Sequence, residues 1–348
     1  MNVAPDEDRL LIQETARGYL ADHAGQDLDA PEGWNPALWA GFAGELGFAG
    51  LMVPERFGGL GLSATTMAAV LEETGRALAQ MPFFETAVLA VQAILAGGSE
   101  GQQATLLPGI AAGEICAAFA GTASRPSLAN GRLTGEADFV SFGHVAHLFV
   151  VATREGPLVA LPAAAASVTR IANLDATRPF STVRFDGAVG EDQVLAIPGA
   201  FHRTMKVGAG LLAAEQAGGA RQCLDMTADY ARQRVQFGRP IGSFQAVKHM
   251  LADMMVSVES ARSAALLAAA AIDGGDDPAE ACSIARAWCS DEYLHCAGQA
   301  IQLHGGIGFT WEHPAHRYFK RARSSATWLG AATEHRERVA ARIIPEAA

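Results

Sequence analysis

Two short stretches of the chain combine arginine, glutamine and glycine, which are residue types that can contact a ligand. The first runs from Arg234 through Phe237-Gly238 to Phe244-Gln245, and the second reads Gln302-Leu303-His304-Gly305-Gly306. An arginine guanidinium forks onto phosphate oxygens, and adjacent glycines let a backbone approach a ligand closely. Taken alone, the glycine pair is better explained as the C-cap of a helix. It therefore indicates a ligand site only together with Gln302 and the arginine motif.

Composition narrows the class of partner. The chain has 348 residues, a net charge of −11 and 18% charged residues. This length predicts two or three packed domains. The negative charge argues against nucleic acid and against an anionic membrane, because both need basic surface. An anionic ligand such as coenzyme A stays possible, since a few local arginines suffice.

The N-terminus and the cysteines favour a cytoplasmic protein. Residues 1–20 begin with the acids Asp6, Glu7 and Asp8, which is unlike a signal peptide. No uncharged stretch approaches the length of a membrane span with the right character, so we expect no membrane insertion. The five cysteines are scattered, as in reduced proteins. Three of them repeat every seven residues (Cys282, Cys289 and Cys296), which predicts small core residues on one helix face and no metal site.

The hydrophobic pattern predicts an α+β protein with three domains. Residues 1–117 show helical periodicity, and residues 118–197 contain short segments rich in Val, Phe and Leu bounded by turn residues. Residues 198–348 return to long alanine-rich helices, expected over 201–233, 245–272 and 278–303. The expected strands are Leu133–Ser141, Leu148–Ala152, Leu158–Leu161, Ser167–Ile171, Thr182–Phe185 and Gln193–Ala196.

Two glycine-rich stretches do not indicate a nucleotide site. Gly208-Ala209-Gly210-Leu211-Leu212-Ala213 matches a dinucleotide fingerprint, but that fingerprint needs a preceding strand, and this match lies in a helical run. The loop Glu45–Gly61 has no strand-to-helix context either, so we interpret it as a tight connection.

Longer motifs resemble the flavin-dependent acyl-CoA dehydrogenase family over nearly the whole chain. They are Tyr230–Gly238 followed by Phe244-Gln245, the segment Leu46–Gly61, and Leu174–Arg178. The resemblance implies an N-terminal helical domain, a small central β domain and a C-terminal four-helix bundle. It also implies α,β-desaturation of an acyl-CoA thioester in fatty-acid or steroid side-chain degradation. FAD is then the hydride acceptor, and an electron-transfer flavoprotein is the expected partner.

The same resemblance assigns cofactor-binding residues. It implies that Arg234 binds the FAD pyrophosphate, with Phe237 and Gln245 nearby. It implies that Gln302, Gly305 and Gly306 meet the adenine side of an FAD held by a neighbouring subunit, in a homo- or hetero-oligomeric dimer or tetramer. For the flavin ring, Phe139 and Ser141 match one family motif. The other ring motif is absent, because Ala120–Pro126 is a shortened and altered version.

The catalytic glutamate of the family is missing. The two family positions for this base hold Leu329, within Trp328-Leu329-Gly330, and Gly208, and neither can take a proton. Glu215 lies two helical turns beyond Gly208, but we favour a solvated or paired surface glutamate there. Three hypotheses remain: an active dehydrogenase with a relocated base, a base-lacking or non-catalytic partner subunit of a hetero-oligomer, and a flavin-dependent oxygenase. We favour the partner subunit.

Overall fold

The chain forms two compact units in a computed structural model that describes residues 7–24, 33–275 and 277–344. The β unit comprises His23–Met67 and Gln80–Gly208. The C-terminal unit comprises the chain from Ala209 onward together with Met1–Asp22 and Ala68–Ala79. Each unit therefore assembles segments that are distant in sequence.

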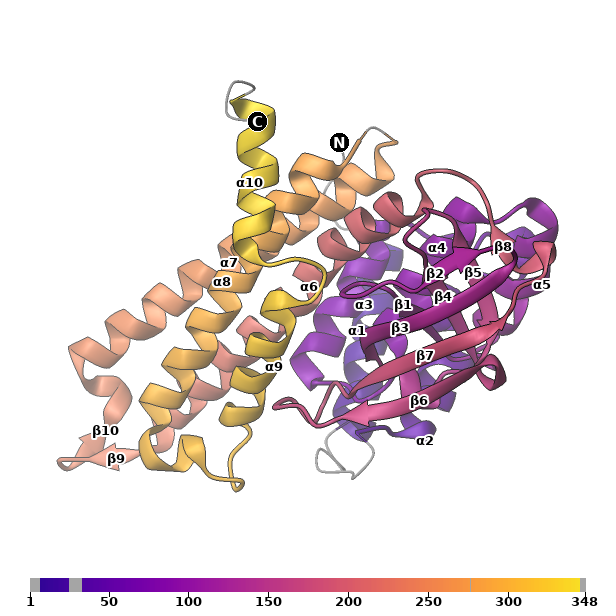
Figure 1. Ribbon diagram of the computed structural model, residues 1–348. Coiled ribbons are helices and arrows are strands. Elements are labelled where there is room, and N and C mark those ends of the chain that lie inside the picture. Colours follow the sequence, from indigo (N-terminus) through magenta and orange to yellow (C-terminus); the bar gives the residue numbers. More distant parts are fainter. Residues whose placement is uncertain (1–6, 25–32, 276, 345–348) are drawn as a thin grey trace. The chain divides into compact units, whose positions relative to one another are not determined.

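Within the described residues, the β unit contains two four-stranded sheets, with strand orders β1-β4-β5-β8 and β2-β3-β7-β6 (Figure 1). All neighbouring pairs are antiparallel except β1 and β4. Alternating apolar side chains of both sheets, including Phe149, Val151 and Phe185, build one buried core. The strands are β1 (Ala117–Ala120), β2 (Ser127–Ala129), β3 (Arg132–Ser141), β4 (Leu148–Ala152), β5 (Leu158–Pro162), β6 (Ala166–Ile171), β7 (Phe180–Ala188) and β8 (Val194–Leu195).

Short helices complete the β unit. Helix α5 begins at a capping box, in which Ser99 and Gln102 satisfy each other's backbone N–H groups. The connection before α3 is tight, as expected: a Cβ on Gly59 would lie 2.2 Å from the carbonyl oxygen of Val53. The helices are α2 (Pro36–Trp39), α4 (Val91–Gly97) and α5 (Glu100–Ala111), with π-helical turns at Ala40–Glu45 and Phe84–Ala90.

Long helices build the C-terminal unit, and the three expected over 201–233, 245–272 and 278–303 are confirmed. Helix α7 has the length and hydropathy of a membrane span. A core helix has the same properties, and Met254, Ala261 and Ala265 of α7 are buried in this bundle. All five cysteines are buried. The helices are α1 (Glu7–His23), α3 (Ala64–Ala77), α6 (Ala200–Gln233), α7 (Gln245–Asp273), α8 (Ala279–His304), α9 (Ala315–Thr327) and α10 (Ala332–Ile343).

Glycine brings α3 and α6 into backbone contact inside the C-terminal unit. A Cβ added to Gly75 would lie 1.9 Å from the carbonyl oxygen of Glu215, and one added to Gly218 would lie 1.8 Å from that of Glu72. The clashing atoms are backbone, so no rotamer change can relieve them. The two helices can therefore cross at this distance only with glycine at both positions.

This close crossing predicts that Gly218→Ala destabilises the fold strongly. Overpacking of this kind costs about 1–3 kcal/mol or more, and urea unfolding followed by circular dichroism measures it. Gly298→Ala in α8 is the matched control, because no atom lies within 4 Å of its added Cβ. That control should be neutral or stabilising by up to about 1 kcal/mol. Equal effects of the two substitutions would refute the close crossing.

Candidate functional site

A hairpin at one end of the helical bundle carries the arginine motif. It consists of β9 (Val235–Gln236) and β10 (Arg239–Pro240), and Phe237 and Gly238 form its turn with φ of 53° and 76°. Phe237 is 91% exposed. Within the described residues, no hydrogen bond or ion pair engages the side chain of Arg234. The motif therefore projects away from its own bundle with its guanidinium uncommitted.

The glutamine–glycine motif lies at the same end of the bundle, where α8 turns towards α9 (Figure 1). Gly305 has a φ of 62° and ends α8, so it does serve as a helix cap. Gln302, Gly305 and Gly306 are also exposed. A Cβ at either glycine would meet nothing within 4 Å. The backbone here is accessible to a ligand, and so is Gln245, the exposed first residue of α7.

Aromatic rings stabilise this end of α8, which the sequence analysis did not predict. The rings of Tyr230 and His304 stack at 4.4 Å between centroids, and those of His304 and His313 lie 4.1 Å apart. Burial, together with the neighbouring histidines, lowers the pKa of His313 to about 4, so the stack is uncharged at neutral pH. An uncharged, packed stack fixes the backbone on which Gln302 and Gly305 depend.

Leu329, which the family resemblance assigns to the first position for the base, is held in a specific conformation. Its side chain is 3% exposed, and its φ of 60° is left-handed, which costs roughly 1–2 kcal/mol for a non-glycine residue. The fully buried Arg286 donates hydrogen bonds of 2.6 Å to the carbonyls of Ser325 and Trp328. His335 Nε2 lies 3.0 Å from the Leu329 carbonyl. The loop is firmly held, yet its side chain has no titratable group.

Glu215, the weak candidate for a relocated base, differs from its predicted environment. It is 4% exposed, so the expectation of a surface residue was wrong, although the expectation of a paired one is confirmed. Its Oε1 accepts a hydrogen bond of 3.1 Å from Nη1 of Arg321, which is itself 2% exposed. The second family position, Gly208 in α6, offers no proton acceptor. A carboxylate held by a buried guanidinium is poorly placed to accept a substrate proton.

The residues expected near the flavin ring bond within the β unit. Phe139 lies at an irregularity in β3 with a φ of 54° and is 52% exposed. Ser141 is 2% exposed, and its hydroxyl donates a 2.5 Å hydrogen bond to buried Glu85. Asp138, the residue before Phe139, accepts hydrogen bonds from Ser124 and Thr182. These polar groups are therefore satisfied by the protein itself.

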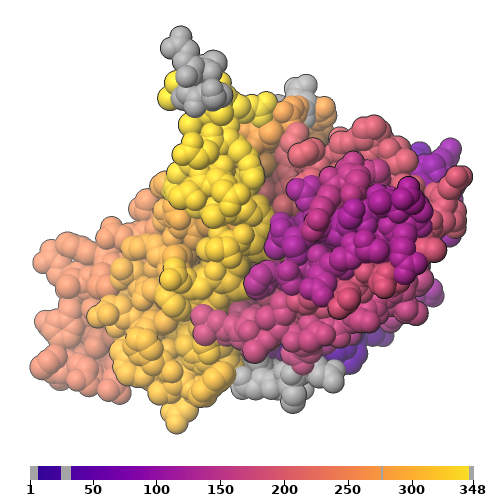
Figure 2. Space-filling model, in the orientation of Figure 1, coloured from indigo at the N-terminus to yellow at the C-terminus, as the bar shows by residue number. Residues whose placement is uncertain are grey.

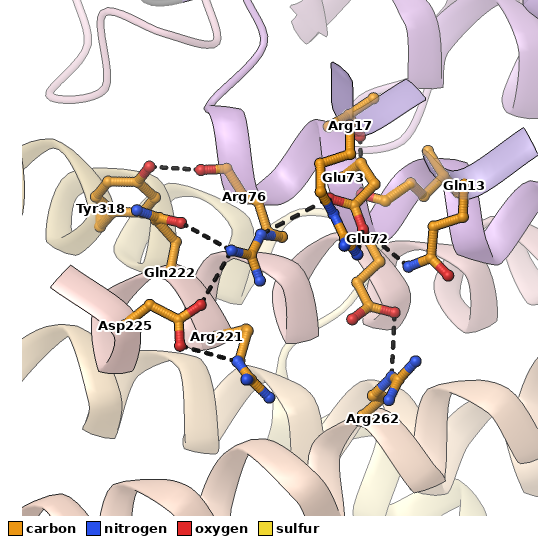
Figure 3. Close-up of polar contacts among 12 residues, drawn as sticks. Gln13, Arg17, Glu72, Glu73, Arg76, Arg221, Gln222, Asp225, Arg262 and Tyr318 are labelled. Atoms are coloured by element: carbon orange, nitrogen blue, oxygen red, sulfur yellow. Dashed lines mark hydrogen bonds and ion pairs between the residues drawn. The ribbon is translucent and has the colours of Figure 1, made fainter. Parts of the chain in front are cut away.

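A charged network that the sequence analysis missed joins α1, α3 and α6 (Figure 3). Buried Glu73 accepts hydrogen bonds of 2.8 Å from both Gln13 and Arg17 and lies 3.7 Å from Nε of Arg76. Arg76 in turn donates to Asp225 of α6 at 3.0 Å. The network steadies the half of α6 that leads to Arg234. Apart from Glu73 and Arg76, which are three residues apart, its hydrogen-bonded partners are 56 to 149 residues apart, so no local pattern predicts them.

Known proteins of one family are similar to this chain in sequence. The family models described as acyl-CoA dehydrogenase N-terminal domain and C-terminal domain match residues 6–114 and 199–344. Acyl-CoA dehydrogenase IpdE2 of Mycobacterium tuberculosis is 35% identical over 346 residues, covering 98% of this chain and 99% of the relative. The chain therefore belongs to the acyl-CoA dehydrogenase family of flavoproteins.

Solved structures give the same fold. The ChsE4–ChsE5 complex of Mycobacterium tuberculosis contains a chain that is 28% identical, with a TM-score of 0.90 and coverage of 99% of both chains. Butyryl-CoA dehydrogenase of Megasphaera elsdenii aligns with a TM-score of 0.92 at 20% identity, covering 99% of this chain and all of that one. The predicted fold, a helical N-terminus, central sheets and C-terminal helices, is confirmed.

The buried His335 predicts a pH dependence of stability. Burial lowers the pKa of His335 to about 4, whereas an unfolded histidine titrates near 6.5. As pH falls from about 6.5 to 4, the unfolded chain takes up a proton that the folded chain refuses, so the free energy of unfolding should fall. Urea titrations at pH 7 and pH 4.5 should differ less for His335→Gln than for wild type. Identical differences would contradict this role of burial.

Proposed function

We propose that this chain is a base-lacking subunit of an acyl-CoA dehydrogenase assembly and acts with a second, homologous chain. One observation supports the proposal: Leu329, which the family resemblance assigns to the position of the base, is buried in a loop held by Arg286 and His335. In this proposal the partner chain supplies the carboxylate that removes the α-proton of the thioester. The chain is cytoplasmic, and an electron-transfer flavoprotein reoxidises the assembly.

The residues at the end of the bundle fit one half of an FAD site. FAD supplies the hydride acceptor when bound. Arg234 would bind the pyrophosphate, since its guanidinium is exposed and uncommitted within the described residues. Phe237 and Gln245 would lie beside it, and Gln302, Gly305 and Gly306 would receive the adenine side. Exposure of all six residues suits a cofactor whose ring is held by another subunit.

Hydrogen bonds within the β unit support the proposal that the partner chain, and not this one, holds the flavin ring. The Ser141 hydroxyl donates to Glu85, and Asp138 engages Ser124 and Thr182. In this proposal those groups serve the fold, so the partner holds the flavin ring. The relative from the ChsE4–ChsE5 complex belongs to an assembly of two different chains, which favours a hetero-oligomer here. The substrate would be an acyl-CoA from fatty-acid or steroid side-chain degradation.

An active dehydrogenase with a relocated base is the second candidate. Glu215 is the residue in question, and its ion pair with Arg321 disfavours it. A flavin-dependent oxygenase would need no base, but no feature of the described residues favours that chemistry.

The half-site predicts that Arg234→Gln lowers the FAD content of the assembly purified from its native host through a tag on this chain. Loss of a charge-assisted hydrogen bond costs about 1.5–3 kcal/mol, or roughly 10- to 150-fold in affinity. Arg232→Gln is the matched control, because Arg232 is exposed two residues away and pairs with Asp229. Flavin absorbance per assembly reports the outcome. Equal FAD content in both variants would show that Arg234 does not bind FAD.

The missing base predicts that the chain alone does not oxidise a saturated acyl-CoA in an assay with an artificial electron acceptor and added FAD. General-base catalysis contributes about 10²–10⁴-fold, and Leu329 cannot provide it. In this proposal the partner holds the flavin ring, so Leu329→Glu alone should stay as inactive as the matched variant Leu329→Gln. An ordinary rate for wild type would refute the proposal, and its loss in Glu215→Gln would identify the relocated base.

A further inference from the structure

A groove of about 900 Å³ lies in the β unit, formed by the N-terminal part of α5, the end of β5 and the segment after β8. This volume is within the range of about 300–1,000 Å³ typical of small-molecule sites. None of the residues proposed above to bind FAD lines it. It is therefore a separate feature that the dehydrogenase chemistry does not explain.

The walls of the groove are mainly apolar. They include Leu106, Ile115, Leu148 and Ala160, with Ile197 48% exposed at the rim. The groove exists because the edge strand β8 pairs only with Leu158 and Val159, whereas β5 continues to Pro162. Beyond β8, the described chain provides no further strand along β5, so apolar surface stays open there. Such a surface suits the hydrocarbon part of a ligand.

His147 supplies one defined hydrogen-bond donor in this apolar surface. Its Nδ1 accepts a hydrogen bond of 3.0 Å from the backbone N–H of Cys116. In the neutral ring the proton therefore resides on Nε2, which becomes a donor. Among the described residues, no acceptor engages this Nε2–H. A ligand oxygen in the groove can take that place.

The charges that line the groove indicate whether the ligand oxygen that accepts from His147 is anionic or uncharged. Glu191 and Asp192 line the groove, and neither joins an ion pair with a described residue. No lysine or arginine lines it. A carboxylate, a phosphate or a coenzyme A thioester would therefore meet like charge without compensation. We propose that this groove binds an uncharged, largely apolar molecule whose carbonyl or hydroxyl oxygen accepts a hydrogen bond from His147.

The fluorescent ketone Prodan tests the proposal, because it is uncharged and apolar and has one carbonyl acceptor. It should bind wild type saturably, with emission shifted to the blue of its value in water. His147→Asn places an amide oxygen near the position of Nδ1 and so preserves the bond from Cys116, but it lacks the Nε2 donor. Binding should weaken about 3- to 10-fold, and the emission of the bound probe should shift further to the blue.

A second pair of variants tests the location of the site. Ile197→Glu places a charge at the rim of the groove and should abolish Prodan binding. Leu174→Glu is the control, because Leu174 is 63% exposed in the same unit but does not line the groove. Equal effects of these two substitutions would overturn the site. An unchanged emission in His147→Asn would overturn the donor, and equally tight binding of the anionic probe 1-anilinonaphthalene-8-sulfonate would overturn the charge argument.

Discussion

The buried guanidinium of Arg286 holds the loop that contains Leu329, and the proposed function depends on this loop. Taking this charge out of water costs several kcal/mol unless hydrogen bonds replace its hydration. The carbonyls of Ser325 and Trp328 provide two such bonds, each of 2.6 Å, at the end of α9. The space-filling view shows α9 and α10 (yellow) beside α8 (orange) on one face of the C-terminal unit (Figure 2). Arg286 of α8 and His335 of α10 thus fix the backbone on either side of Leu329.

The loop at Leu329 is firmly held although this side chain has no titratable group, which fits the role within an assembly that we propose. Leu329 has a left-handed backbone conformation, which costs free energy, and a buried arginine holds the backbone beside it. We would not expect this arrangement in a chain that has no role in the reaction. The exposed side chains of Arg234 and Phe237 at the end of the bundle are consistent with this role. Both features are explained if one chain positions the cofactor and another performs the proton transfer.

Helical periodicity predicted the long helices, and short segments rich in Val, Phe and Leu between turn residues predicted most strands, including β4 and β5, which are almost entirely buried. The bounds of α6, α7 and α8 agree with the expectation within a residue or two. The short strands β1, β2, β9 and β10 were not predicted, since segments of two to four residues carry too little pattern. The burial of Glu215 was unpredictable for another reason: its partner Arg321 is 106 residues away. The inward hydroxyl of Ser141 likewise depends on Glu85, 56 residues away.

Native mass spectrometry of the purified chain, alone and in the assembly isolated from its native host, tests the central claim most directly. The account predicts that the chain alone carries no FAD, because in the proposal the partner chain holds the flavin ring. It also predicts that the assembly contains a homologous second chain and fewer FAD molecules than protein chains. One tightly bound FAD per chain in a preparation of this chain alone would contradict the account.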